Sequence, residues 1–292
     1  MKPIFIGSGV AIVTPFDKDG KIDFETFKTL IDNQIINKTD AVIVCGTTGE
    51  GSTLTVDERL ELFDFAVKRI DGRVPVIAGT GSNSTSFTLS LAKQAETQGI
   101  DAHLIVTPYY NKTSQKGLIE HYFALADNLE KPVIIYNVPS RTGMNITPET
   151  YCELAKHKNI VGVKEADSNI PKLIKSMSLC KDNLHFYTGN DDNICPAMSV
   201  GCKGAISVLA NILPEYTHNM VMSGYNGDFR KCSQMQKRCI ELINLLFTDV
   251  NPIPIKAALE LSGINSCNLR LPLVKADVNL YKRIEAELRK FV

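Results

Sequence analysis

The chain has 292 residues, of which 44% are hydrophobic and 22% are charged. Lysine plus arginine and aspartate plus glutamate are equal at 32 each, and neither sign gathers in a long block. This balance argues against nucleic acid or an anionic membrane as the main partner. The composition is that of an ordinary soluble globular protein, with enough residues for two domains or for one α/β barrel.

The cysteines and histidines form no recognisable metal-binding motif. Eight cysteines and five histidines are scattered without a C-x-x-C or H-E-x-x-H pattern, so we expect no structural zinc site. Scattered reduced cysteines suit the cytoplasm. The apolar N-terminal run is interrupted by glycines and closed by Pro15, which favours a buried first strand over a signal peptide. No stretch approaches the roughly 20 apolar residues that span a bilayer. We therefore expect a cytoplasmic protein.

Eight short runs rich in β-branched and apolar residues recur along the chain. Amphipathic segments separate them, such as 56–70 and 85–99, and the second of these ends in glycine, as many helices do. Alternating strands and helices predict a parallel sheet with right-handed crossovers. The eight predicted strands lie at 9–16, 41–48, 74–81, 102–110, 132–139, 160–166, 185–191 and 204–211.

Eight such repeats predict an α/β fold of the (β/α)₈ TIM barrel type over residues 1–223. The remainder, 224–292, is helix-like and contains no further strand, so we interpret it as an appended C-terminal helical segment. The alternative is a doubly wound open sheet, because one sequence indicates element type better than topology.

A lysine stands near the end of the sixth predicted strand. Side chains of a barrel strand alternate between the interior and the helix layer. We expect Val161 and Val163 to face the helices, which leaves Gly162 and Lys164 pointing inward. The same alternation in the preceding strand turns Tyr136 inward. Both polar residues then lie near the carboxyl ends of their strands, where barrel enzymes carry out their chemistry.

Lys164 permits two interpretations. It is either a strand-end lysine that reaches solvent or pairs with Glu165 or Asp167, or a desolvated amine that attacks a carbonyl and forms a Schiff base. The polar residues at the other strand ends distinguish between these readings.

The second predicted strand ends in GTTGEG at 46–51. The motif lacks the Lys-Ser/Thr pair of a nucleotide-binding loop. Its backbone N–H groups and the hydroxyls of Thr47 and Thr48 suit a small carboxylate. A glycine turn with a threonine cap explains the motif equally well.

Phenols and an arginine follow the fourth and fifth predicted strands. Tyr109, Tyr110 and Tyr136 can relay protons when they are hydrogen-bonded, although each alone could simply pack. Arg141 could hold a substrate carboxylate or lie in solvent. Combined with Lys164 on one rim, these groups favour a lyase or synthase that acts on a 2-oxo acid.

The same residues carry a resemblance to a known family. The runs GVAIVTPF, GTTGE, VIAGTGSN, TPYYN, YNVPSRTG, GVKEA, TGND and GAISVLAN occur in the order typical of dihydrodipicolinate synthases. The sequence resembles that family from about residue 5 to the RLPL stretch at 270–273. N-acetylneuraminate lyases and keto-deoxy-sugar-acid aldolases share several motifs and remain alternatives. A catalytically idle barrel with a binding or regulatory role is the third.

The resemblance implies a mechanism in which Lys164 forms an imine with pyruvate. Thr48 and the backbone around Ile206 would place the carboxylate and methyl group of pyruvate. The resulting enamine would attack L-aspartate 4-semialdehyde, giving the first committed intermediate of diaminopimelate and lysine synthesis. Tyr136 would move protons to and from the imine.

The resemblance assigns the remaining site residues in the same way. Thr47 would link Tyr136 to Tyr110, which reaches the site from a neighbouring subunit. Arg141 would hold the carboxylate of the semialdehyde, and Gly189 would line the pocket. No cofactor or metal is required. We expect a homo-oligomer, with a tetramer built from two dimers as the leading arrangement.

One departure from the family pattern concerns feedback regulation. Lysine-inhibited members grip the effector with a glutamate and nearby histidines. The matching positions here are Phe87, Val56 and Arg59, although Asn83 and Tyr109 remain. Without the carboxylate, the ammonium group of lysine loses its partner.

We therefore predict that L-lysine inhibits this protein weakly or not at all. Initial rates measured over a range of lysine concentrations test this. Half-maximal inhibition below the ordinary cellular lysine concentration contradicts the prediction.

Overall fold

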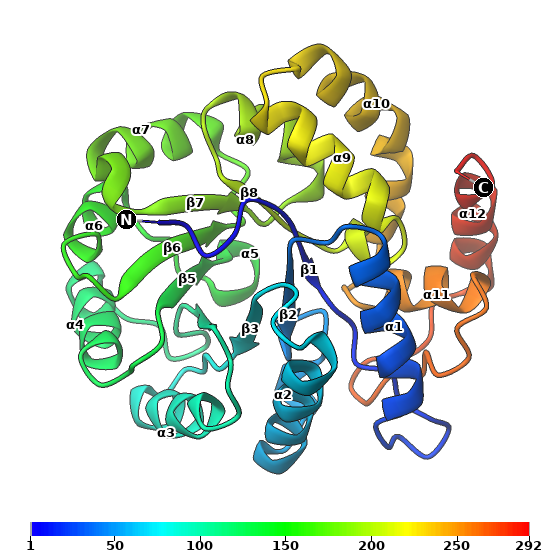
Figure 1. Cartoon of the computed structure of the whole chain (residues 1–292), viewed down its shortest axis with the longest axis horizontal. Coiled ribbons are helices and arrows are strands. Elements are labelled where there is room, and N and C mark those ends of the chain that lie inside the picture. The colour runs from blue at the N-terminus through cyan, green and yellow to red at the C-terminus, as the bar shows by residue number, and fades with distance from the viewer. Residues whose placement is uncertain (1, 292) are drawn as a thin grey trace.

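The computed structural model describes residues 2–291 and shows a closed barrel of parallel strands in the order β1 to β8 (Figure 1). Each predicted strand is present, and the ends of the predicted ranges form the loops that follow. The (β/α)₈ prediction is therefore confirmed. The strands are β1 Gly7–Ala11, β2 Ala41–Val44, β3 Val76–Gly79, β4 Ala102–Val106, β5 Val133–Asn137, β6 Ile160–Glu165, β7 His185–Thr188 and β8 Gly204–Ser207.

Helices surround the barrel and continue beyond it. Residues 51–53, 181–183, 191–193 and 209–211 add short 3₁₀ turns. The helices are α1 Phe24–Ile36, α2 Val56–Ile70, α3 Thr85–Glu96, α4 Gln115–Ala126, α5 Pro139–Thr142, α6 Pro148–Leu154, α7 Ile170–Cys180, α8 Ile194–Ser199, α9 Pro214–Tyr225, α10 Phe229–Leu246, α11 Ile253–Leu261 and α12 Val278–Leu288. Among the described residues, no helix is long and apolar enough to cross a membrane.

Local sequence explains where α2 begins. The Thr55 side chain accepts a hydrogen bond from the Glu58 amide at 3.2 Å, and the Glu58 carboxylate accepts one from the Thr55 amide at 2.9 Å. This capping box satisfies two backbone donors that the first turn leaves free. It therefore sets where the chain leaves the loop after β2 and enters the helix.

The strands separate two apolar layers. In β5, Val133 and Ile135 belong to the large cluster that packs the helices onto the barrel, while Ile134 and Tyr136 belong to a smaller cluster inside it. This is the two-residue alternation expected of a barrel strand. It confirms the inward orientation of Tyr136.

The prediction for Val161 was wrong. Val163 packs in the outer layer as expected, but Val161 belongs to the interior cluster. The cause is a β-bulge: Val133 pairs with Ile160, whereas Ile134 already pairs with Gly162. The extra residue interrupts the alternation at this point. Beyond the bulge the pairing is regular, and Tyr136 lies opposite Lys164.

The C-terminal helices pack beside one side of the barrel. α10 contacts α8, α9 and α12, and α11 contacts α12 and the 3₁₀ turn after β8. Figure 1 shows α11 and α12 on the same side as α1 and away from α4 and α6. The boundary predicted after residue 223 falls in the last turn of α9.

A buried histidine links α3 to α4. His121 is 6% exposed, and its Nδ1 lies 2.8 Å from the Thr85 hydroxyl. Burial lowers the pKa of His121 from 6.5 to about 4. His121 is thus harder to protonate in the folded state than in the unfolded state. Its contribution to the free energy of unfolding is complete above pH 6.5 and is lost as the pH falls toward 4.

We predict that a His121→Asn variant loses less stability than the wild type when the pH falls from 7 to 4.5. The difference should be about 2 kcal/mol in the free energy of unfolding. Urea unfolding at both pH values measures it. Thr85→Val is the control, since it removes the hydroxyl partner but keeps the buried imidazole. Equal pH dependence in wild type and His121→Asn contradicts the prediction.

Candidate active site

Lys164 is buried at the carboxyl end of β6, with 5% of its surface exposed. Its Nζ lies 4.5 Å from the centroid of the Tyr136 ring on the neighbouring strand. The ring face attracts an ammonium ion, whereas burial disfavours the charge. The side chain therefore neither reaches solvent nor pairs with Glu165 or Asp167. Its amine is held against a phenol inside the barrel rim.

A glycine leaves room for this lysine. A Cβ atom built on Gly189, just after β7, would lie 3.0 Å from Lys164 Cε and 2.9 Å from Ala166 Cβ. A larger residue would press on the lysine side chain. Gly189 therefore lies beside Lys164, where the family resemblance puts a pocket residue.

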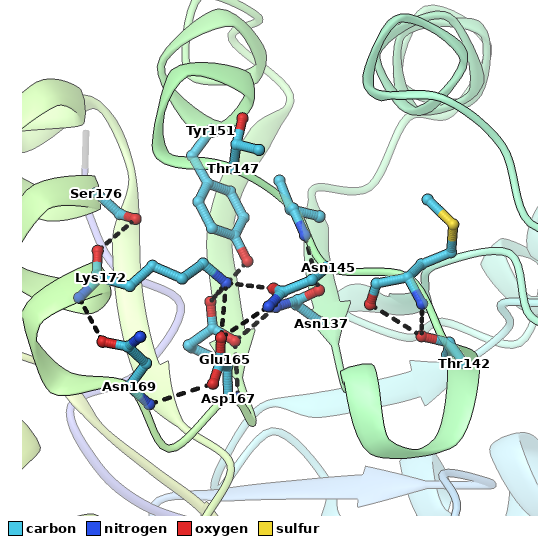
Figure 2. A network of polar contacts seen from close by, with 12 residues as sticks. Asn137, Thr142, Asn145, Thr147, Tyr151, Glu165, Asp167, Asn169, Lys172 and Ser176 are labelled. Carbon is cyan, nitrogen blue, oxygen red and sulfur yellow. Dashed lines mark hydrogen bonds and ion pairs between the residues drawn. The ribbon is translucent and has the colours of Figure 1, made fainter.

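The residue after Lys164 fixes the strand from its outer side. Glu165 Oε1 accepts from Asn137 Nδ2 at 2.7 Å and from the Asp167 amide at 2.9 Å, and its Oε2 accepts from the Tyr151 hydroxyl at 2.8 Å (Figure 2). Burial raises the pKa of Glu165, and Lys172 with these hydrogen bonds opposes that rise. The network joins the ends of β5 and β6, which carry Tyr136 and Lys164.

Lys172 from α7 completes the network. Its Nζ lies 3.6 Å from Glu165 Oε2 and 3.1 Å from Asp167 Oδ2, and it donates to Asn145 Oδ1 (Figure 2). The amine of Lys172 is thus paired with two carboxylates. Lys164 points to the opposite side of β6 and has no part in these contacts.

The loop after β8 is held by a buried carboxylate. Asp191 Oδ2 accepts from the amides of Val208 and Leu209 at 3.0 and 2.8 Å. Burial raises the pKa of Asp191, while its hydrogen bonds and Lys164 act in the other direction. Ile206, just before this loop, is fully buried and belongs to the interior cluster with Tyr136. Its backbone pairs with β1, where Ile206 lies opposite Gly9.

The turn after β2 is also buried and tied down. Thr48 is 2% exposed, and the Glu50 amide donates to the Thr47 carbonyl at 3.1 Å. Glu50 adopts a left-handed conformation with φ of 52°. A turn of this kind can present backbone N–H groups to an anion, and the role expected of Thr47 and Thr48 in binding a carboxylate stays a prediction.

A cavity of about 240 Å³ opens at this end of the barrel. Its described lining includes two guanidinium groups, Arg59 and Arg141, and no carboxylate. An anionic ligand therefore meets only attractive charge there. Of the predicted site residues, Thr47, Tyr136 and Arg141 line the cavity together. Lys164 adjoins it through the Tyr136 ring and is not one of the lining residues.

Tyr110, another predicted site residue, lies outside this cavity lining. It is 91% exposed and has a φ of +67°, so a single chain does not bring it to Tyr136.

Two of the positions matched to a lysine-effector pocket, Arg59 and Tyr109, line the cavity. Burial lowers the pKa of Arg59.

Sequence reasoning missed the contribution of the C-terminal segment. Asn251 Nδ2 donates to Thr48 Oγ1 at 3.0 Å, and Lys256 Nζ lies 2.5 Å from Glu50 Oε1. Both contacts join residues about 200 positions apart, which no local pattern indicates. The sequence signal was slight: a polar residue before proline in NPIP, within an otherwise helix-like region.

The potential metal ligands of the described residues do not cluster. No group of three or more His, Cys, Asp or Glu side chains within 2–291 is arranged to hold a metal ion. The eight cysteines are free thiols. Burial raises the pKa of Cys45, which lines the cavity, to about 12. Cys45 thus behaves as a packing residue.

Comparison with known proteins identifies relatives over nearly the whole chain. Residues 4–291 match the model of the dihydrodipicolinate synthetase family. A 4-hydroxy-tetrahydrodipicolinate synthase of Caldicellulosiruptor saccharolyticus is 52% identical over 93% of this chain and 92% of its own. Synthase 1 of Clostridium acetobutylicum is 46% identical over 99% and 98%. The solved dihydrodipicolinate synthase of Thermotoga maritima has a TM-score of 0.96 and 39% identity, covering 99% of both chains.

Proposed function

The chain belongs to the dihydrodipicolinate synthetase family, and we propose that Lys164 is the residue through which it binds pyruvate covalently. It is an enzyme that condenses pyruvate with L-aspartate 4-semialdehyde to give 4-hydroxy-tetrahydrodipicolinate, a step of lysine biosynthesis. The observation that carries the assignment is the buried amine of Lys164, 4.5 Å from the Tyr136 ring centroid at the rim.

The first half of the reaction joins Lys164 to pyruvate. The amine of Lys164 attacks C2 of pyruvate, water leaves, and an imine links Nζ to C2. Thr48 and the backbone around Ile206 hold the pyruvate carboxylate and methyl group. Loss of a methyl proton then converts the imine to an enamine, whose terminal carbon is nucleophilic.

Protons move through hydroxyl groups. The Tyr136 ring lies beside Lys164 Nζ, and in the proposed relay its hydroxyl takes a proton from the attacking amine and returns one to the departing water. Thr47 lines the same cavity as Tyr136 and is the next group of the relay. The relay ends at Tyr110 of a neighbouring subunit. The high exposure of Tyr110 in a single chain supports this role.

The second half uses the arginine. Arg141 binds the carboxylate of L-aspartate 4-semialdehyde with its planar guanidinium group. The enamine carbon attacks the aldehyde carbon and forms the new C–C bond, while the C=O π bond opens and its oxygen takes up a proton from the relay, which replaces the methyl proton lost earlier. The amino group of the semialdehyde then adds to the imine carbon and displaces Lys164, which closes the ring and restores the free amine.

These steps balance without an added cofactor or metal, and we propose that none takes part. The relay through Tyr110 requires at least a dimer, and a tetramer built from two dimers is our proposal for the assembly. The free thiols are consistent with a reducing compartment, and we propose the cytoplasm.

We predict that Arg141→Leu raises the KM for L-aspartate 4-semialdehyde by about 10- to 100-fold, because charged hydrogen bonds to the carboxylate are lost. The KM for pyruvate should change much less. Steady-state kinetics with each substrate varied in turn measures both values. Arg230→Leu, at an exposed position, is the matched control.

An aldehyde panel completes this test. The wild type should use L-aspartate 4-semialdehyde far better than the sugar aldehydes that sialic-acid lyases and sugar-acid aldolases accept. A preference for a sugar aldehyde, or an unchanged KM in Arg141→Leu, contradicts the assignment of Arg141.

A further inference from the structure

Asn251 joins the two groups that bind substrate carboxylates. Its Nδ2 donates to Thr48 Oγ1 at 3.0 Å, and its main-chain carbonyl accepts from an Arg141 Nη2 at 3.2 Å. The residue is 7% exposed and precedes α11 in the C-terminal segment. One residue outside the barrel strands therefore contacts both the pyruvate side and the semialdehyde side of the site.

In the hydrogen bond between Asn251 and Thr48, the amide is the donor and the hydroxyl oxygen is the acceptor. A threonine hydroxyl has one proton to donate and two lone pairs that accept. Because the Asn251 amide donates to Thr48 Oγ1, it occupies a lone pair and leaves the hydroxyl proton free. A free hydroxyl proton is what a pyruvate carboxylate requires. An acceptor at position 251 would instead draw that proton away.

The segment that carries Asn251 is anchored to the same turn. Lys256 Nζ lies 2.5 Å from Glu50 Oε1, and the Arg270 amide donates to Glu50 Oε2 at 3.1 Å. The side chains of Lys256 and Glu50 are 1% and 0% exposed. Lys256 also donates to the Asn268 carbonyl at 2.7 Å. A buried ion pair of this kind resists relative movement because separating its charges is costly.

We propose that Asn251 is a positioning residue for the condensation, acting on pyruvate through the Thr48 hydroxyl and on the semialdehyde by steadying Arg141. This inference rests on the proposed function of Lys164, Thr48 and Arg141. It makes the C-terminal segment part of the active site. The buried Lys256–Glu50 pair supports Asn251 by fixing the segment against the turn.

The test measures the half-saturating pyruvate concentration for reductive trapping of the imine, in the absence of semialdehyde. Asn251→Ala removes the donor and should raise this concentration about tenfold, because one orienting hydrogen bond is lost. Asn251→Asp has the same size but accepts the Thr48 proton and adds negative charge, so its increase should be larger. Asn279→Asp, on an exposed face of α12, is the matched control and should match the wild type.

A double-mutant cycle separates positioning from a general structural effect. If Asn251 acts through Thr48, then Thr48→Val and Thr48→Val/Asn251→Ala should have the same half-saturating pyruvate concentration. If the two substitutions instead raise the half-saturating pyruvate concentration additively, the proposal is overturned. The proposal is also overturned if Asn251→Asp has the same half-saturating pyruvate concentration as the wild type. It is overturned, too, if Asn251→Ala lowers the melting temperature but leaves pyruvate binding unchanged. Saturable trapping in the wild type is the separate check of the proposed function, and its absence overturns both.

Discussion

The candidate active site depends on the closure of a parallel barrel, because closure sends the carboxyl ends of all eight strands to one rim. Within that rim, register decides which side chains meet. The pairing of Tyr136 with Lys164 brings a phenol ring to 4.5 Å from an amine that has little contact with water. Burying an amine is unfavourable for a structure unless its charge is compensated, but a buried amine is useful as a nucleophile.

Two further sets of contacts keep the rim in place. On the outer face of β6, Glu165 collects hydrogen bonds from Asn137 and Tyr151 and an ion pair from Lys172, so the strand cannot shift without breaking a buried network. On the opposite side of the site, the C-terminal segment holds the turn after β2 through Asn251 and Lys256. The end of β6 that carries Lys164 and the turn after β2 are thus supported from separate parts of the chain.

Much of this architecture could be predicted from local sequence, since strands and helices differ in their hydrophobic period. Two-residue alternation was sufficient to predict that Tyr136 and Lys164 point inward. It failed at Val161, because a β-bulge depends on pairing with a neighbouring strand and leaves no mark in the strand's own sequence. Asn251 and Lys256 were missed because their partners lie about 200 residues away. Tyr110 illustrates another limit, since its proposed role depends on a second subunit.

Reductive trapping shows most directly whether Lys164 is the amine that binds pyruvate. The protein is incubated with pyruvate and borohydride, digested, and mapped by peptide mass spectrometry. We expect a single reduced pyruvate adduct on Lys164, and no adduct in a Lys164→Ala variant. Absence of an adduct, or an adduct confined to another lysine, would contradict this expectation and leave Lys164 as a buried lysine without a chemical role.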